Sequence, residues 1–133
     1  MRAIRVVTCA VIEKEGKILI ARRKRGDHMG GKWEFPGGTV ERDETPEQCL
    51  MRELKEELGV DIGVDEFICS SQYAYDHATI NLLAFKATLL SDELKLCAHE
   101  EIRWVSPREL GRYDFPEADA PIIRRITASR EKG

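Results

Sequence analysis

The sequence contains no apolar run approaching the roughly 20 residues that a helix needs to cross a bilayer. Its first residues, MRAIRVVTCAVIEKEGK, alternate between apolar and polar side chains and then meet a charged turn. A signal peptide would instead show a continuous apolar stretch before a small-residue cleavage site. These absences argue against an integral membrane protein and favour a cytoplasmic location.

The chain also lacks an excess of positive charge, because its net charge is −3. A protein that follows the phosphates of duplex nucleic acid normally needs a clustered positive face. We therefore expect neither duplex nucleic acid nor a membrane as a partner. A single nucleotide whose charge is neutralised by a cation is compatible with this composition, bound by a monomer or a homodimer.

Cysteine is scarce and scattered along the chain. Cys9, Cys49, Cys69 and Cys97 form none of the close pairs that structural zinc sites use. In a chain without export features, we interpret them as small buried apolar residues rather than as redox groups.

The sequence has no internal repeat, no low-complexity tract and no linker long enough to separate domains. Its 133 residues fit one compact domain that spans positions 1–133 and needs no disulfide or structural metal to support its core. With 42% hydrophobic and 34% charged residues, the composition is that of a globular protein.

Alternation typical of strands is present in several places. Residues 3–13 and 17–22 alternate on either side of the turn EKEGK, which predicts a hairpin. Residues 67–75 and 79–90 predict two more strands, and residues 102–105 predict a short one. These segments predict a mixed or antiparallel sheet.

Capping residues mark the helices. Thr45 is a candidate N-cap, with Gln48 in position to complete a capping box. Gly59 stands where a left-handed residue ends a helix, so the helix is predicted from about Pro46 to Leu58.

Two later segments carry similar signals. Residues 106–109 repeat the capping box before a short helix, and residues 122–126 show a helical spacing of isoleucines after Asp119. Helices before and after the late strands predict an α+β fold, with helices packed on both sides of a sheet.

Three glutamates in the predicted helix suggest its chemistry. Glu53, Glu56 and Glu57 are spaced i, i+3 and i+4, which places their carboxylates within about 100° of one face. Such crowding of like charges destabilises a helix unless a cation is bound. Magnesium prefers oxygen ligands and keeps several waters, so these carboxylates and substrate phosphates could complete its shell.

The alternative is an acidic end of an ordinary surface helix. Two features favour function. Glu56 and Glu57 lie at the helix C-terminus, where they oppose the macrodipole. The preceding sequence Phe-Pro-Gly-Gly at 35–38 makes a tight turn whose backbone can approach a metal or phosphate closely.

Residues 38–60, GTVERDETPEQCLMRELKEELGV, resemble the Nudix box GX5EX7REUXEEXGU, with U aliphatic, at every specified position. Similarity to MutT-type nucleotide pyrophosphohydrolases continues in RRKRGDHMGGKWEFPGG before the box and in DFPEADAPII near the end. The resemblance implies an α/β/α sandwich around a mixed sheet. It also implies that water attacks a phosphorus of a nucleoside triphosphate, releasing nucleoside monophosphate and pyrophosphate.

The resemblance implies roles for the motif residues. Glu53, Glu56 and Glu57 would bind the metal or activate the water, and the Gly37 carbonyl would be a further ligand. The expected ion is Mg²⁺, with Mn²⁺ as a substitute.

Other residues are expected to support these groups. Arg52 would orient a glutamate bidentately, and Glu44 would act similarly. Arg23 would contact a phosphate, or be a solvated charge at a strand end. His28, in a glycine-rich loop, would approach the substrate or simply lie on the surface.

Three residues are expected near the base or the phosphates. The Gly38 backbone can approach the substrate, and Phe35 can stack on the base or belong to the core. Asp119 stands where MutT-type sequences usually have asparagine, and relatives acting on cytidine nucleotides also carry aspartate there. An ionised aspartate only accepts hydrogen bonds, so it would take one from the cytosine amino group or from N–H groups of guanine, or it would cap the helix.

One position departs from the family pattern. Alanine stands at Ala98, where related enzymes often supply a distal glutamate. Either Glu100 replaces that glutamate as a metal ligand from a shifted loop, or the enzyme uses only the helix carboxylates.

Three functions therefore compete. The first is MutT-like sanitation of the nucleotide pool, removing 8-oxo-dGTP in support of DNA repair, and the longer similarities favour it slightly. The second is a pyrophosphohydrolase for CTP, dCTP or modified pyrimidine nucleotides. The third is a Nudix domain that binds a nucleotide without catalysis, which the intact set of three glutamates disfavours.

Overall fold

The computed structural model describes residues 3–26 and 29–131. The elements in chain order are β1 (Ile4–Lys14), β2 (Lys17–Arg23), β3 (Trp33–Glu34), β4 (Gly37–Thr39), α1 (Pro46–Leu58), β5 (Ile62–Ala74), β6 (Thr79–Leu89), β7 (His99–Val105), the 3₁₀ turns η1 (Pro107–Arg112) and η2 (Glu117–Asp119), and α2 (Ala120–Glu131). Strands and helices are mixed along the chain, so the predicted α+β class is confirmed.

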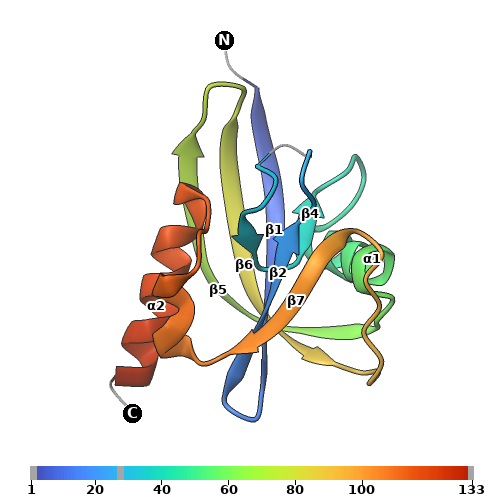
Figure 1. Ribbon diagram of the computed structural model, residues 1–133. Coiled ribbons are helices and arrows are strands. Elements are labelled where there is room, and N and C mark those ends of the chain that lie inside the picture. Colours follow the sequence, from blue (N-terminus) through green and yellow to red (C-terminus); the bar gives the residue numbers. More distant parts are fainter. Residues whose placement is uncertain (1–2, 27–28, 132–133) are drawn as a thin grey trace.

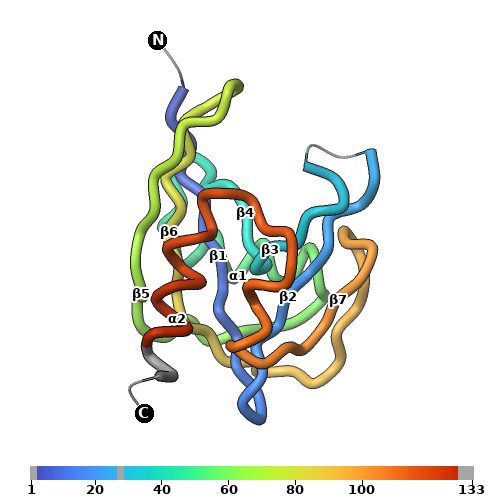
Figure 2. Tube along the Cα trace, turned by 60° about the vertical axis from the view of Figure 1, so that its left-hand side comes forward, coloured from blue at the N-terminus to red at the C-terminus, as the bar shows by residue number. Residues whose placement is uncertain are grey.

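The strands form one mixed sheet in the order β3-β2-β1-β6-β5, with β4 added beside β1 and β7 beside β2. β1 runs parallel to β6, whereas the pairs β1/β2, β2/β7 and β5/β6 are antiparallel. Figure 2 shows β5 and β6 on one side of the molecule and β2 and β7 on the other, with α2 in front. The predicted hairpin of β1 and β2 is confirmed.

The two long helices cover different parts of the sheet, α2 at one side and α1 at the other (Figure 1). Leu50, Leu54 and Leu58 of α1 are fully buried in one apolar cluster, and Ile122 and Ile126 of α2 are buried in a second. Burial of each such side chain contributes about 1.5–3 kcal/mol. The leucine stripe therefore fixes the rotation of α1 and the direction of its glutamates.

The caps of α1 form as predicted. The Thr45 hydroxyl accepts a hydrogen bond from the Gln48 N–H at 3.1 Å, and the Gln48 side chain accepts one from the Thr45 N–H at 3.0 Å. Gly59 ends the helix with φ of 67°. These contacts set the first and last turns of the helix that carries the glutamates.

Some boundaries differ from the predictions. β5 begins at Ile62 rather than at residue 67, because irregular pairing around Phe67 interrupts the alternation that marks a strand. β7 begins at His99 rather than at residue 102. The segment after Ser106 is a 3₁₀ turn, and the Ser106 hydroxyl hydrogen-bonds the Glu109 carboxylate instead of capping the backbone.

All four cysteines are free thiols. Cys9 and Cys49 are buried as predicted, but Cys69 is half-buried and Cys97 is exposed. Cys97 is on the loop before β7 with its side chain exposed, so its prediction as a buried residue was wrong. In the ranges that the structure describes, no helix has both the length and the apolar character needed to span a membrane.

Candidate active site

The glycine turn, residues 35–38, bends at Pro36 and then enters the short strand β4 at Gly37, so it is a bend and a strand rather than the tight turn that the sequence predicted. Its two glycines lie between β1 and α1. Gly37 pairs with Cys9, and Gly38 pairs with Thr8. A Cβ atom at Gly37 would collide with the Thr8 carbonyl, and one at Gly38 would collide with the Glu53 carboxylate. Glycine therefore allows the close approach of the β1 backbone at Gly37 and of the Glu53 carboxylate, the first of the predicted metal site, at Gly38.

Two side chains fix the position of the Gly38 carbonyl. The Gly38 carbonyl accepts hydrogen bonds from the Thr8 hydroxyl at 3.2 Å and from the Cys49 thiol at 3.4 Å. Cys49 is fully buried. The sequence suggested that Cys49 was only a small buried apolar residue. Its thiol also links α1 to the glycine turn.

Arg52 joins the carboxylates of the motif. Its Nε and Nη2 donate to the two oxygens of Glu44 at 2.7 and 3.0 Å, a bidentate pair. Its Nη1 donates to Glu53 at 2.9 Å and to Glu56 at 3.2 Å. The hydrogen bonds from Arg52 hold the pKa of Glu44 at about 2, so this carboxylate is ionised throughout the physiological range.

We expect Arg52→Lys to lower kcat by about 10- to 100-fold, with the fold retained. A lysine ammonium cannot make the bidentate contact with Glu44 and reach Glu53 at the same time, so the orientation of Glu53 is lost. Steady-state kinetics would measure the loss. Arg42→Lys, in the exposed loop before α1, is the control, and equal activity in the two variants would contradict the positioning role.

Glu57 belongs to a second group of side chains, with Glu34 and His99. Candidate ligand atoms of these three residues all lie within 4.8 Å of one another. His99 Nε2 lies 2.8 Å from the Glu34 carboxylate and 3.7 Å from Glu57 Oε1. Three different elements, β3, α1 and β7, supply the group.

The Glu57 carboxyl is in an unfavourable environment for its charge. Burial raises its pKa to about 10, with further contributions from the Glu53 side chain and the charge of Glu34. Its Oε1 atom is buried without a hydrogen-bond partner among the described residues. An orphaned oxygen amid like charges is what a bound cation would satisfy.

Glu34 and His99 were not singled out from the sequence. Glu34 is adjacent to the Phe-Pro-Gly-Gly segment, and His99 is adjacent to Ala98, the position that departs from the family pattern. His99 is placed by an irregularity in the pairing of β2 with β7, next to Arg23. No local pattern could predict that irregularity, so proximity to the motif was the only signal available.

Glu100 lies elsewhere. Its carboxylate is 3.4 Å from Arg22 Nε and 4.0 Å from Arg25 Nε, and it is not a member of the group around Glu57. Glu100 is the residue that the irregular pairing skips, between Glu101 opposite Arg22 and His99 opposite Arg23. These contacts favour the alternative in which the distal glutamate is not replaced by Glu100.

A cavity of about 500 Å³ adjoins the glycine turn. Arg23, Phe35 and Gly38, all predicted to be near the substrate, line it together with Asp119. Arg23 Nη1 lies 3.1 Å from Glu34, at the boundary between the cavity and the carboxylates. His28, the other residue predicted to be near the substrate, lies outside the described residues.

Phe35 and Asp119 form part of the cavity wall. Phe35 is buried and packs against Phe115, with ring centroids 5.2 Å apart, so it is both a core residue and a lining residue. Asp119 is only 7% exposed and ends the η2 turn. Burial, with the charge of Glu34, raises the pKa of Asp119 to about 8.

The chain is similar to several known proteins over most of its length. The NUDIX domain family model matches residues 7–125. The CTP pyrophosphohydrolase of Escherichia coli K12 is 39% identical over 130 residues, which cover 98% of this chain and 96% of that protein. The 8-oxo-dGTP diphosphatase of the same organism is 30% identical over 126 residues, or 95% and 98% of the two chains.

Solved structures show the same architecture. The E. coli ORF135 protein matches with a TM-score of 0.83 at 37% identity, covering 97% of this chain and 92% of that one. The MutT protein of Methanosarcina mazei Go1 matches with a TM-score of 0.87 at 25% identity, covering 97% and 96%. The expected fold, a mixed sheet between helices, is confirmed.

Proposed function

The chain belongs to the NUDIX domain family, and from that premise we propose that it is a magnesium-dependent nucleoside triphosphate pyrophosphohydrolase. Water adds to a phosphorus of the triphosphate chain, the bridging P–O bond breaks, and the products are nucleoside monophosphate and pyrophosphate. The observation that carries the proposal is the nearness of two features. One is the pair of partly buried carboxylates of Glu53 and Glu57, and the other is a cavity of about 500 Å³ whose lining includes Glu34, Gly37 and Gly38.

The residues present fit a divalent cation. The partnerless Oε1 of Glu57, the nearby Glu53 and Glu34 carboxylates and the imidazole of His99 form an oxygen-rich donor set suited to Mg²⁺ or Mn²⁺. Glu53, Glu57 and the Gly37 carbonyl would hold the ion, with Glu56 at the exposed edge. A bound cation would supply charge neutralisation for the phosphates and a more acidic water.

The chain's own side chains position the reacting groups. Arg52 fixes the direction of Glu53 through the hydrogen bond from its Nη1. Arg23 lines the cavity and lies 3.1 Å from Glu34, which supports a contact with a phosphate that extends from the cavity toward the carboxylates. In the ionised state, Glu53 or Glu57 accepts the proton of the attacking water, a role that requires hydrogen-bond distance to it.

The substrate that the cavity supports best is 8-oxo-dGTP. Because its pKa is raised to about 8, Asp119 is largely neutral at pH 7 and both donates and accepts hydrogen bonds, as an asparagine amide would. A guanine edge offers both donors and acceptors. Phe35 gives the base an apolar surface.

The second candidate is CTP or a modified pyrimidine nucleotide. It is favoured by the 39% identity, over nearly the whole chain, to a CTP pyrophosphohydrolase. Ionised Asp119 could accept a hydrogen bond from the cytosine amino group. The two candidates therefore differ in which protonation state of Asp119 reads the base.

The proposed function is tested by measuring pyrophosphate release from 8-oxo-dGTP, dGTP, CTP and dCTP with Mg²⁺ and with a chelator. We expect turnover of at least one nucleotide, lost with chelator and restored by Mg²⁺ or Mn²⁺. Nucleotide binding by calorimetry without turnover of any of the four would support the non-catalytic module. Turnover that persists in chelator would contradict the metal assignment.

The preference between the two bases should depend on pH. Asp119 is neutral below a pKa of about 8 and ionised above it. Raising the pH from 6.5 to 8.5 should therefore lower kcat/KM for 8-oxo-dGTP relative to CTP by a factor of about five or more, roughly 1 kcal/mol. The comparison of the two substrates cancels the titration of the catalytic groups that they share.

Asp119→Asn serves as the control, since an amide does not titrate in this range. In that variant the ratio of the two kcat/KM values should stay constant across the same pH interval. A pH-independent ratio in the wild type, or the same slope in both proteins, would show that Asp119 does not read the base.

A further inference from the structure

One wall of the cavity depends on a short turn with little support of its own. Ala118 and Asp119 of the η2 turn and its N-cap Pro116 line the cavity, together with Ile80 and Leu82 of the sheet. The turn has only three residues, and its N-cap Pro116 provides no side-chain hydrogen bond. Within the turn, the Asp119 N–H bonds to the Pro116 carbonyl at 3.1 Å.

The Ala118 N–H is near the start of this turn, where backbone donors lack partners within a helix. It donates to the Tyr75 hydroxyl at 2.9 Å, a contact between residues 43 positions apart. Ala118 is itself 4% exposed, so losing this acceptor would leave a buried donor unsatisfied. The hydrogen bond from Ala118 thus ties the cavity wall to the end of β5.

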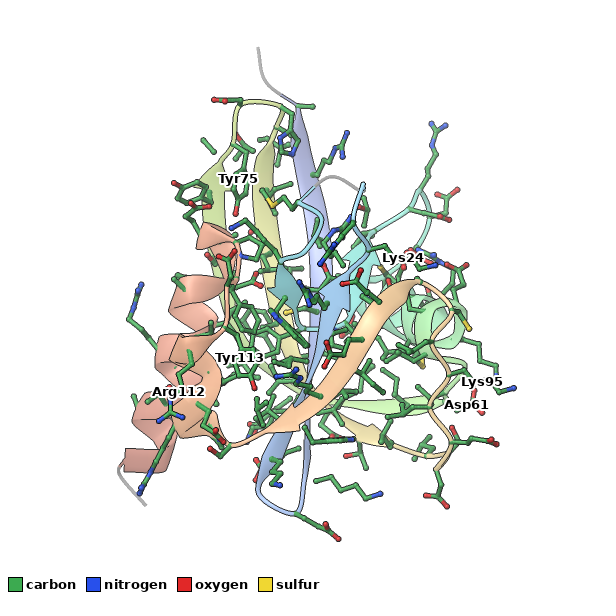
Figure 3. All side chains as sticks on the ribbon, in the orientation of Figure 1. Lys24, Asp61, Tyr75, Lys95, Arg112 and Tyr113 are labelled. Carbon is green, nitrogen blue, oxygen red and sulfur yellow. The ribbon has the colours of Figure 1, made fainter. Side chains whose placement is uncertain are left out.

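Tyr75 is held in place independently of η2. Its backbone N–H donates to the Ala78 carbonyl at 2.9 Å in the turn between β5 and β6. Its ring contacts those of Tyr73 and His77, with centroid distances of 4.7 and 5.7 Å. Figure 3 shows Tyr75 near the end of β5, beside the start of α2.

We propose that Tyr75 is a positioning residue for base recognition. Its hydroxyl fixes the η2 turn and thereby the position of Asp119 in the cavity wall. Tyr75 itself also lines the cavity. The inference rests on the proposed function, because it concerns the base-binding part of the same site. It assigns to Tyr75 a role in KM and specificity and none in the chemical step.

The test compares Tyr75→Phe, which removes only the hydroxyl, with Tyr73→Phe as the matched control. Tyr73 is in β5, two residues before Tyr75, its ring contacts the Tyr75 ring, and it is 40% exposed. Each protein is assayed with 8-oxo-dGTP, with CTP and with 2-deoxyribose 5-triphosphate, which has the phosphates but no base.

In Tyr75→Phe we expect KM to rise about fivefold or more for the preferred nucleotide, while kcat changes less than about twofold. KM for the base-less triphosphate should not change, and Tyr73→Phe should match the wild type with all three. An unchanged KM in Tyr75→Phe, or an equal rise with and without a base, would overturn the proposal, since the latter would mean a general disturbance of the fold.

Failure of the proposed function is distinguishable from failure of this inference. Should the wild type hydrolyse no nucleotide, the proposed function fails, and the comparison is made on affinity for 8-oxo-dGMP and CMP by calorimetry. A weaker affinity in Tyr75→Phe, with deoxyribose 5-phosphate unaffected, would still support the role of Tyr75. Equal affinities in the wild type and both variants would overturn it.

Discussion

The Glu57→Gln variant is expected to turn over substrate at least about a hundredfold more slowly than the wild type, or about 2.7 kcal/mol of barrier. Glutamine has nearly the same shape, but it carries no charge for a cation and cannot accept a proton from water. The orphaned Oε1 and the crowding by Glu53 and Glu34 make this charge central to the site. Steady-state kinetics at saturating Mg²⁺ would measure the loss.

Glu47→Gln is the matched control, because Glu47 is an exposed glutamate in the first turn of the same helix. It should retain wild-type turnover. Circular dichroism would show whether either variant has lost helix. Near-wild-type turnover in a folded Glu57→Gln protein would remove Glu57 from the catalytic group and leave the role to the other carboxylates of α1.

Although Glu57→Gln should lower activity, it should raise the stability of the protein when no metal is present. The folded-state pKa of Glu57 is raised to about 10, above its ordinary value of 4.5, so the folded wild type loses stability as the pH rises between these values. In chelator, Glu57→Gln should therefore unfold at a higher temperature than the wild type at pH 7, and the difference should shrink toward pH 4. Added Mg²⁺ should stabilise the wild type more than the variant.

The carboxylates that the sequence predicted as metal ligands lie within one short segment. Spacing along α1 places Glu53, Glu56 and Glu57 on one side whatever the rest of the fold does, and the caps that define the helix are local. Arg52 likewise contacts its partners within the motif. Helical periodicity and capping are therefore sufficient for this half of the site.

Glu34 and His99 required the tertiary structure. They are 65 residues apart and meet only because β2 pairs with both β3 and β7. The irregular pairing beside Arg23 decides that His99 enters the carboxylate group and that Glu100 does not. A shift of one residue in the pairing of a strand exchanges the faces of its side chains. A sequence pattern that locates the strand only to within one residue therefore cannot decide between His99 and Glu100.

Gly38→Ala is expected to abolish most activity while leaving the protein folded. The added methyl group would occupy space taken by the Glu53 carboxylate. That carboxylate is the far end of a flexible side chain, so it can move aside at a modest cost in stability, but it then leaves its contact with Arg52. We expect kcat to fall by about a hundredfold or more, comparable to loss of a catalytic group.

Gly37→Ala provides the contrasting case, because its methyl group would collide with the backbone of Thr8 and Cys9, which cannot rotate away. We expect that variant to lose about 1–3 kcal/mol or more of stability, as overpacked sites do. Gly111→Ala is the control for both, since a Cβ there meets nothing within 4 Å. Thermal unfolding and kcat, measured on all three, should separate loss of activity at Gly38 from loss of stability at Gly37. If Gly38→Ala keeps wild-type kcat, the Glu53 carboxylate does not need the position it takes against the glycine turn; if Gly38→Ala instead unfolds as readily as Gly37→Ala, the turn and not the carboxylate sets the requirement for glycine.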